Sequence, residues 1–136
     1  MNKQLSFQPE GLSPSLFEAL EGLTRKAVAL PLAVCLKKAA DHLVAAVEAS
    51  RKLPLVNVRL AQAIFDCCQE LVNNFAALPA HSKGWIKGAI LYFAQTTDGA
   101  HDFETLGGFE DDCEVLNACL RLAHREDLII NPEDYD

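Results

Sequence analysis

The sequence predicts an all-α protein: a single-domain bundle of about five helices. Three observations lead to this fold class. Apolar residues recur at intervals of three and four along most of the chain. No stretch combines alternating apolar and polar residues with the β-branched enrichment typical of strands. The chain has 136 residues, of which 50% are hydrophobic and 23% charged, as in an ordinary globular domain.

The helical domain is expected over residues 13–130, between a flexible N-terminal tail (1–12) and a C-terminal tail (131–136). Ser13 followed by Pro14 predicts the start of a first helix, because serine caps helices and proline fits the first turn. Pro31 ends that helix and opens a second one, which frays near Arg51 and Lys52. The expected core stripes of these two helices are Leu16, Leu20, Leu23 and Ala27, then Leu32, Cys35, Leu36, Ala39, Leu43 and Val47.

Three further helices follow the break at Leu53-Pro54. Asn57 can cap a third helix that runs to about Ala77. Pro79 stops it, and Ser82 can cap a fourth helix through Phe93. A polar segment then interrupts the pattern, and a fifth helix starts near Phe109. The apolar residues expected inside the last three helices include Leu60, Ile64, Cys68, Leu71, Phe75, Trp85, Ile86, Ile90, Cys113, Leu116 and Leu120.

The net charge of −7 is unevenly distributed along the chain. Residues 1–95 contain ten basic and seven acidic side chains, a balance of +3. Residues 96–136 contain two basic and twelve acidic side chains, a balance of −10. An acidic region repels phosphate backbones, so nucleic acid is not expected as a partner. A protein with a basic surface suits it better, or a divalent cation; a solvated acidic face that aids solubility is the plainer alternative.

Cysteine usage and hydropathy predict a soluble cytoplasmic protein. The five cysteines are odd in number, and none forms a CxxC motif, so we expect reduced thiols in the core rather than disulfides or a zinc site. The N-terminus has no apolar signal-peptide core. The longest apolar run, 27–36, contains Pro31 and is half the length of a membrane span, so no stable membrane insertion is expected.

The segment 92–112 contains the candidate site: Asp98, His101, Asp102, Asp111 and Asp112. Unpaired carboxylates are costly to bury, so this patch lies in water or binds something positive. One interpretation is structural, with Asp98 capping a turn and Asp111 or Asp112 capping the fifth helix. The other is a metal site for Mg²⁺, Ca²⁺ or Mn²⁺ built from these five residues.

The stretch from Gly88 to Leu120 resembles the YkvA-like family, a bacterial domain of unknown function. The resemblance, with the preceding helix from Trp85, covers roughly residues 85–120. Its pattern is an apolar helix, then Asp-x-x-x-Asp-Phe, then Gly-aromatic-x-Asp-Asp before another apolar helix. Asp98, Asp102-Phe103, Gly108-Phe109 and Asp111-Asp112 meet this pattern. The resemblance implies that the four aspartates belong together, and it implies no activity. Polar residues such as Thr96 and His101 replace the family's apolar ones, which argues against a membrane role.

The sequence thus predicts a small acidic protein that binds rather than catalyses, docking a basic partner or holding a cation. An immunity or antitoxin-like inhibitor is one alternative, since opposite charge speeds encounter with a basic toxin. A metal-dependent phosphohydrolase of the HD type is the other. It would use the His101-Asp102 pair, an upstream His42 or His81, and Asp127.

Overall fold

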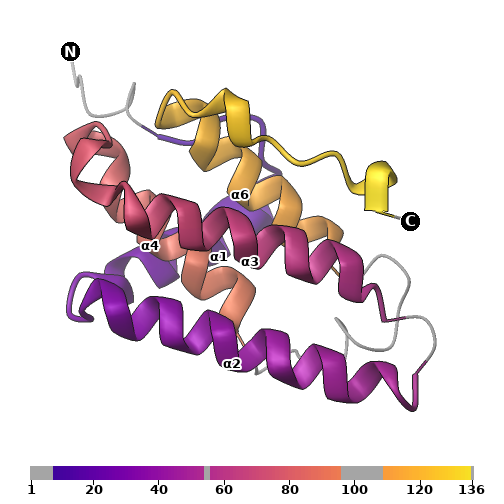
Figure 1. Ribbon diagram of the computed structural model, residues 1–136. Helices are drawn as coiled ribbons and strands as arrows, with labels where there is room; N and C mark the ends of the chain where they lie inside the picture. Colours follow the sequence, from indigo (N-terminus) through magenta and orange to yellow (C-terminus); the bar gives the residue numbers. More distant parts are fainter. Residues whose placement is uncertain (1–7, 54–55, 96–108, 136) are drawn as a thin grey trace.

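The computed structural model describes residues 8–53, 56–95 and 109–135, and these form an all-α bundle (Figure 1). Within these ranges five α-helices and no strand occur, so the predicted fold class is confirmed. Short 3₁₀ turns accompany the helices near Phe75 and in the C-terminal segment. The elements are α1 (Pro14–Ala27), α2 (Leu32–Ser50), α3 (Val58–Asn73), η2 (Phe75–Ala77), α4 (Ala80–Ala94), α6 (Glu110–Leu122), η3 (Glu126–Leu128) and η4 (Pro132–Tyr135).

Two predicted helix starts are confirmed by their capping hydrogen bonds. The backbone N–H of Leu16 donates to Oγ of Ser13 over 3.3 Å, at the start of α1. The N–H of Leu60 donates to Oδ1 of Asn57 over 3.1 Å, at the start of α3. Each cap satisfies an amide that the first helical turn leaves without an intrahelical acceptor.

The predicted cap at Ser82 is wrong. Helix α4 begins at Ala80, with Pro79 in the cap position, so Ser82 lies inside the first turn and is fully buried. Its hydroxyl donates to the carbonyl oxygen of Pro79 over 2.8 Å. The proline that stops the preceding segment also supplies the extended residue that leads into α4, which leaves no separate capping residue between them.

Helix α4 is the centre of the bundle. Eight of its fifteen residues are buried, because it packs against α1, α2 and α6 rather than presenting one broad face to water. The contact with α1 is the tightest. A Cβ placed on Gly88 would lie 3.0 Å from the Cα of Thr24, so only glycine permits this approach of the two backbones.

In the C-terminal half of α2, the most buried residues precede the predicted ones by one position in the sequence. His42 and Ala46 are buried, whereas Val47 is 37% exposed. The helical period from Cys35 and Ala39 leads to 42 and 46 as naturally as to 43 and 47, and a histidine is not an obvious core residue from sequence. His42 fits because its ring meets Phe93 edge-on at 5.1 Å and Phe109 at 6.2 Å between centroids.

Parts of both predicted tails pack on the bundle. Near the N-terminus, Pro9 is buried and Leu12 packs against the core. After α6, the chain turns back along α3 (Figure 1), and Tyr135 packs against the core from the last 3₁₀ turn. Among the described helices, none combines the length and the hydropathy needed to cross a membrane.

Candidate functional site

Of the predicted aspartate cluster, Asp98, His101 and Asp102 lie outside the described residues. Asp111 and Asp112 lie in the first turn of α6, where the positive end of the helix dipole favours carboxylates. Neither takes the cap position, which Phe109 occupies without a side-chain cap, so the predicted capping role is wrong at that position. The two neighbours differ in environment: Asp111 is exposed, whereas Asp112 is only 4% exposed.

The described ranges contain no group of three or more His, Cys, Asp or Glu side chains suited to a metal ion. The convergence of all five predicted ligands therefore stays a prediction, because three of them lie outside these ranges. The other residues of the phosphohydrolase hypothesis stand in three different environments. His42 is in the aromatic core, His81 lines a hollow beside Arg121 and His124, and Asp127 lines a groove on α3.

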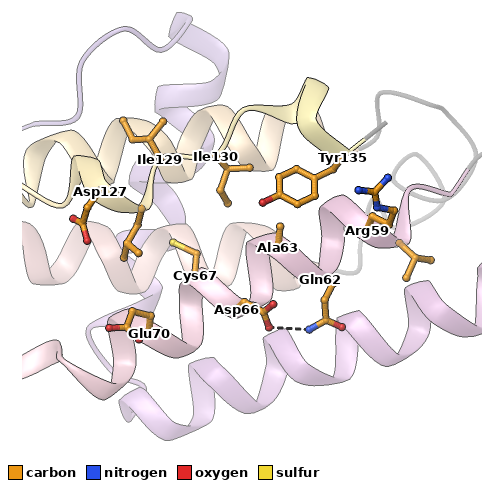
Figure 2. A pocket seen from close by; sticks show the side chains of 12 residues that line it. Arg59, Gln62, Ala63, Asp66, Cys67, Glu70, Asp127, Ile129, Ile130 and Tyr135 are labelled. Atoms are coloured by element: carbon orange, nitrogen blue, oxygen red, sulfur yellow. Dashed lines mark hydrogen bonds between the residues drawn. The ribbon is translucent and has the colours of Figure 1, made fainter.

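That groove lies between α3 and the C-terminal segment and has a volume of about 740 Å³ (Figure 2). We call it the α3 groove. Its floor and one wall come from α3, and the other wall comes from residues 127–135. Its lining residues are Val58, Arg59, Gln62, Ala63, Asp66, Cys67, Glu70, Asp127, Leu128, Ile129, Ile130 and Tyr135.

The α3 groove combines an apolar interior with an acidic end. Figure 2 shows Glu70 and Asp127 at one end and Arg59 at the other, with Asp66 along the α3 side. The three carboxylates outnumber the guanidinium of Arg59 in the lining and that of Arg125 beside it, so one net negative charge remains. Asp66 is held in place by Gln62, whose amide donates to it over 2.8 Å. Asp66 and Glu70 are exposed to solvent, so they can meet a positive group without first being desolvated.

Arg125 organises the acidic end of the α3 groove. Its Nε and Nη2 atoms donate to the two carboxylate oxygens of Asp127, each over 3.0 Å, in the bidentate geometry that arginine favours. Nη2 also lies 4.0 Å from Oε2 of Glu70, which links the C-terminal segment to α3. Hydrogen bonding to Arg125 lowers the pKa of Asp127 below its usual value. This carboxylate is therefore held ionised at neutral pH.

The wall formed by the C-terminal segment is fixed by Asn117 of α6. The backbone N–H of Ile130 donates to Oδ1 of Asn117 over 3.0 Å, and Nδ2 of Asn117 donates to the carbonyl oxygen of Ile130 over 2.8 Å. The thiol of Cys113 donates to the same carbonyl over 3.3 Å. One side chain thus pairs with both polar backbone groups of a residue, as a neighbouring strand would.

All five cysteines are free and buried, as the sequence predicts. Cys67 lines the α3 groove, but burial raises its pKa to about 12. Burial likewise raises the pKa of Cys113 to about 11, and that of Cys119 further. The thiolate is the nucleophilic form, so these thiols are poor nucleophiles at neutral pH and serve as small core residues.

The α3 groove was not predicted from the sequence. Asp66 and Glu70 look like the ordinary solvated face of an amphipathic helix, and the C-terminal segment looks like a tail. The available signal was the pair Ile129-Ile130 followed by Tyr135, since three large apolar residues are unusual in a segment that does not pack. Nothing in the sequence indicated that α3 would be their partner.

Comparisons with models of known protein families, with curated proteins and with solved structures gave no match for this chain. The resemblance to the YkvA-like family therefore rests on the sequence pattern around Asp98 to Asp112 alone.

Proposed function

We propose that this protein is a non-enzymatic binding module that docks a basic segment of a protein partner in the α3 groove. The observation that carries the proposal is the acidic lining of the groove beside an apolar interior: Glu70 and Asp127 at one end, and Asp66 along the α3 side. A partner segment that pairs arginine or lysine with apolar side chains complements both features. Opposite charge would speed its association and fix its orientation.

The groove's surroundings strengthen the negative field. Glu126, Glu133 and Asp134 lie on the same C-terminal segment, so the acidic excess of the C-terminal third extends over this face. The volume of about 740 Å³ lies within the range of ~300–1,000 Å³ usual for binding pockets. Such a hollow accepts a few side chains of a partner, with the rest of the contact on the rim.

The aspartate-rich segment around Asp98 to Asp112 belongs to the same proposal. It would present further carboxylates to a basic partner or hold a divalent cation, as the YkvA-like pattern groups them. A small acidic inhibitor of the immunity or antitoxin type is the narrower form of this function. The metal-dependent phosphohydrolase remains the rival proposal, with Asp98, His101, Asp102, Asp111 and Asp112 as metal ligands.

Peptide titration tests the groove directly. We would titrate the ¹⁵N-labelled protein with three twelve-residue peptides that share leucine positions and carry arginine, glutamine or glutamate at the others. The arginine peptide should shift resonances of α3 and of residues 126–135. Replacing Asp66 by Asn and Glu70 by Gln should weaken binding by roughly 2- to 30-fold, because exposed ion pairs contribute about 0.2–1 kcal/mol each.

The matched control replaces Glu10 and Glu18 by Gln. It removes the same number of exposed negative charges at positions that do not line the α3 groove. Binding that weakens equally in both double variants would show a non-specific charge effect and contradict the proposal. Equal affinity for the glutamine and arginine peptides would contradict it as well.

The rival is tested by calorimetric titration with Mg²⁺, Ca²⁺ and Mn²⁺. A bound metal should raise the melting temperature, since it binds only the folded protein. Binding that Asp102→Asn abolishes, accompanied by hydrolysis of a generic phosphoester, would favour the phosphohydrolase over the binding module.

A further inference from the structure

A second hollow lies where the end of α1, the first half of α2 and the end of α4 meet. It has a volume of about 360 Å³ and shares no lining residue with the α3 groove. We call it the lysine hollow. Its apolar lining consists of three leucines and one alanine, and its polar lining consists of two lysines and one glutamine. These residues are Leu23, Leu30, Leu91, Ala94, Lys26, Lys38 and Gln95.

The charge of the lysine hollow is the reverse of that of the α3 groove. None of its described lining residues is an aspartate or glutamate. Among the described residues, no carboxylate lies within salt-bridge distance of Lys26 or Lys38, although the neighbouring Lys37 is 2.7 Å from Asp41. The chain has a net charge of −7, yet two lysines line this apolar hollow without a partner among the described carboxylates. The hollow is therefore locally positive in an acidic protein.

A third ammonium group stands close by. Nζ of Lys87 donates to the carbonyl oxygen of Leu30 over 2.6 Å, and Leu30 lines the hollow. Burial raises the pKa of the Cys35 thiol, and Lys87 and Lys38 both lower it electrostatically by a smaller amount. Through Leu30, the ammonium group of Lys87 stands next to a hollow that Lys26 and Lys38 line.

The helix dipoles do not account for both lysines. Lys26 lies in the last turn of α1, where a cation complements the negative end of its helix. Lys38 lies in the second turn of α2, far from the C-terminus of its own helix, so the dipole of α2 does not favour it. A negative group between the two ammonium groups would supply the counter-charge that no described carboxylate supplies there.

We propose that the lysine hollow binds a small amphipathic anion, namely a free carboxylate with a hydrocarbon tail of medium length. The carboxylate would meet Lys26 and Lys38, and the tail would cover the leucines. The volume of about 360 Å³ is near the lower end of the ~300–1,000 Å³ range of ligand pockets, which favours a small molecule over a protein segment. Charge complementarity selects the head group, and the apolar lining selects the tail.

The proposal is tested with octanoate as the probe, against acetate, which lacks the tail, and octanol, which lacks the charge. Octanoate should bind saturably and shift amide resonances of residues 23–38 and 91–95. Acetate and octanol should each bind at least about 10-fold more weakly, since each lacks one of the two contacts. The double variant Lys26→Gln, Lys38→Gln should lose about 10-fold in octanoate affinity.

The matched control replaces Lys37 and Lys52 by Gln, which removes two exposed lysines that do not line the hollow. It should bind octanoate as the wild type does. Both double variants should remain folded, with melting temperatures within a few degrees of the wild type, because all four side chains are exposed and the helix-dipole and ion-pair contributions of Lys26 and Lys37 are small. The proposal is overturned if octanoate shows no saturable binding, if octanol binds as well, or if the two double variants lose affinity equally. Binding of an acidic-apolar peptide but not of octanoate would overturn it in favour of a protein partner. The peptide titration of the α3 groove is unaffected by any of these outcomes, so the two proposals fail separately.

Discussion

Replacing Gly88 by Ala should destabilise the bundle, because it forces α1 and α4 apart. The added Cβ would overlap Oγ1 of Thr24 and would lie 3.0 Å from its Cα and 3.1 Å from its Cβ. Rotating the threonine side chain removes only the first of these clashes, so backbone must move. Overpacking of this kind lowers the free energy of unfolding by up to about 3 kcal/mol, and the better helix propensity of alanine raises it by about 1 kcal/mol. The expected net loss is about 2 kcal/mol.

Gly84 and Gly22 provide matched controls for the same chemical change. A Cβ on Gly84 would meet Cγ2 of Thr24 at 3.8 Å, an ordinary van der Waals contact, and a Cβ on Gly22 would meet nothing within 4 Å. Both alanine variants should therefore be more stable than the wild type, by up to about 1 kcal/mol, because glycine is the poorer helix former. The three substitutions thus differ in sign although each adds one methyl group.

Urea denaturation followed by circular dichroism measures these differences, and the melting temperature of Gly88→Ala should fall by roughly 8 °C. Thr24→Ala should be nearly neutral alone, since the described residues offer its buried hydroxyl no hydrogen-bond partner. In the double variant it should recover part of the loss, giving a coupling of about 1 kcal/mol. A Gly88→Ala protein as stable as the wild type, or no coupling with Thr24, would refute the close packing of α1 on α4.

Three further predictions concern α6 and the C-terminal segment that follows it. Asn117→Ala should lower the free energy of unfolding by about 1–3 kcal/mol, because the backbone N–H and C=O of Ile130 lose their hydrogen-bond partner. Amide hydrogen exchange at Ile130 should accelerate, and an unchanged exchange rate would refute this role of Asn117. His124 has a φ of 59° at the end of α6, so His124→Gly should raise the melting temperature, with a gain of up to about 1 kcal/mol, whereas His124→Ala should bring none. In the folded protein the pKa of Asp127 lies below its ordinary value of 3.8. The pairing with Arg125 therefore stabilises the fold fully above about pH 3.8, and this stabilisation is lost as the pH falls through the pKa of the folded state. Acid unfolding of Asp127→Asn should therefore show a shallower loss of stability below pH 3.8 than the wild type, and identical slopes would contradict it.

Local signals made the secondary structure predictable. The caps at Ser13 and Asn57 bond backbone amides three residues away, so the residues that decide them are adjacent in the sequence. Ser82 shows the limit of this reasoning, because a serine after a proline can either cap or enter the first turn. His42 shows another limit: its place in the core depends on Phe93 and Phe109, which come from other helices.

The candidate sites were less predictable than the helices for a physical reason. One wall of the α3 groove contains Ile130, which Asn117 of α6 holds through both of its polar backbone groups. Neither residue carries a sequence signal for this pairing, since an asparagine on a helix is usually solvated. The charge imbalance indicated that the C-terminal segment would be acidic. It did not indicate that Asp66 and Glu70, from the net basic part of the chain, would join Asp127 beside an apolar surface.

The contact between Thr24 and Gly88 also bears on how the chain assembles. Two whole helices, α2 and α3, separate the partners along the chain, so a long loop must close before this contact forms. The neighbouring α2 and α3 can meet with far less loss of chain entropy. We therefore expect the first helix to join late and to detach first, which would make it the earliest target of a protease when the protein is gently warmed.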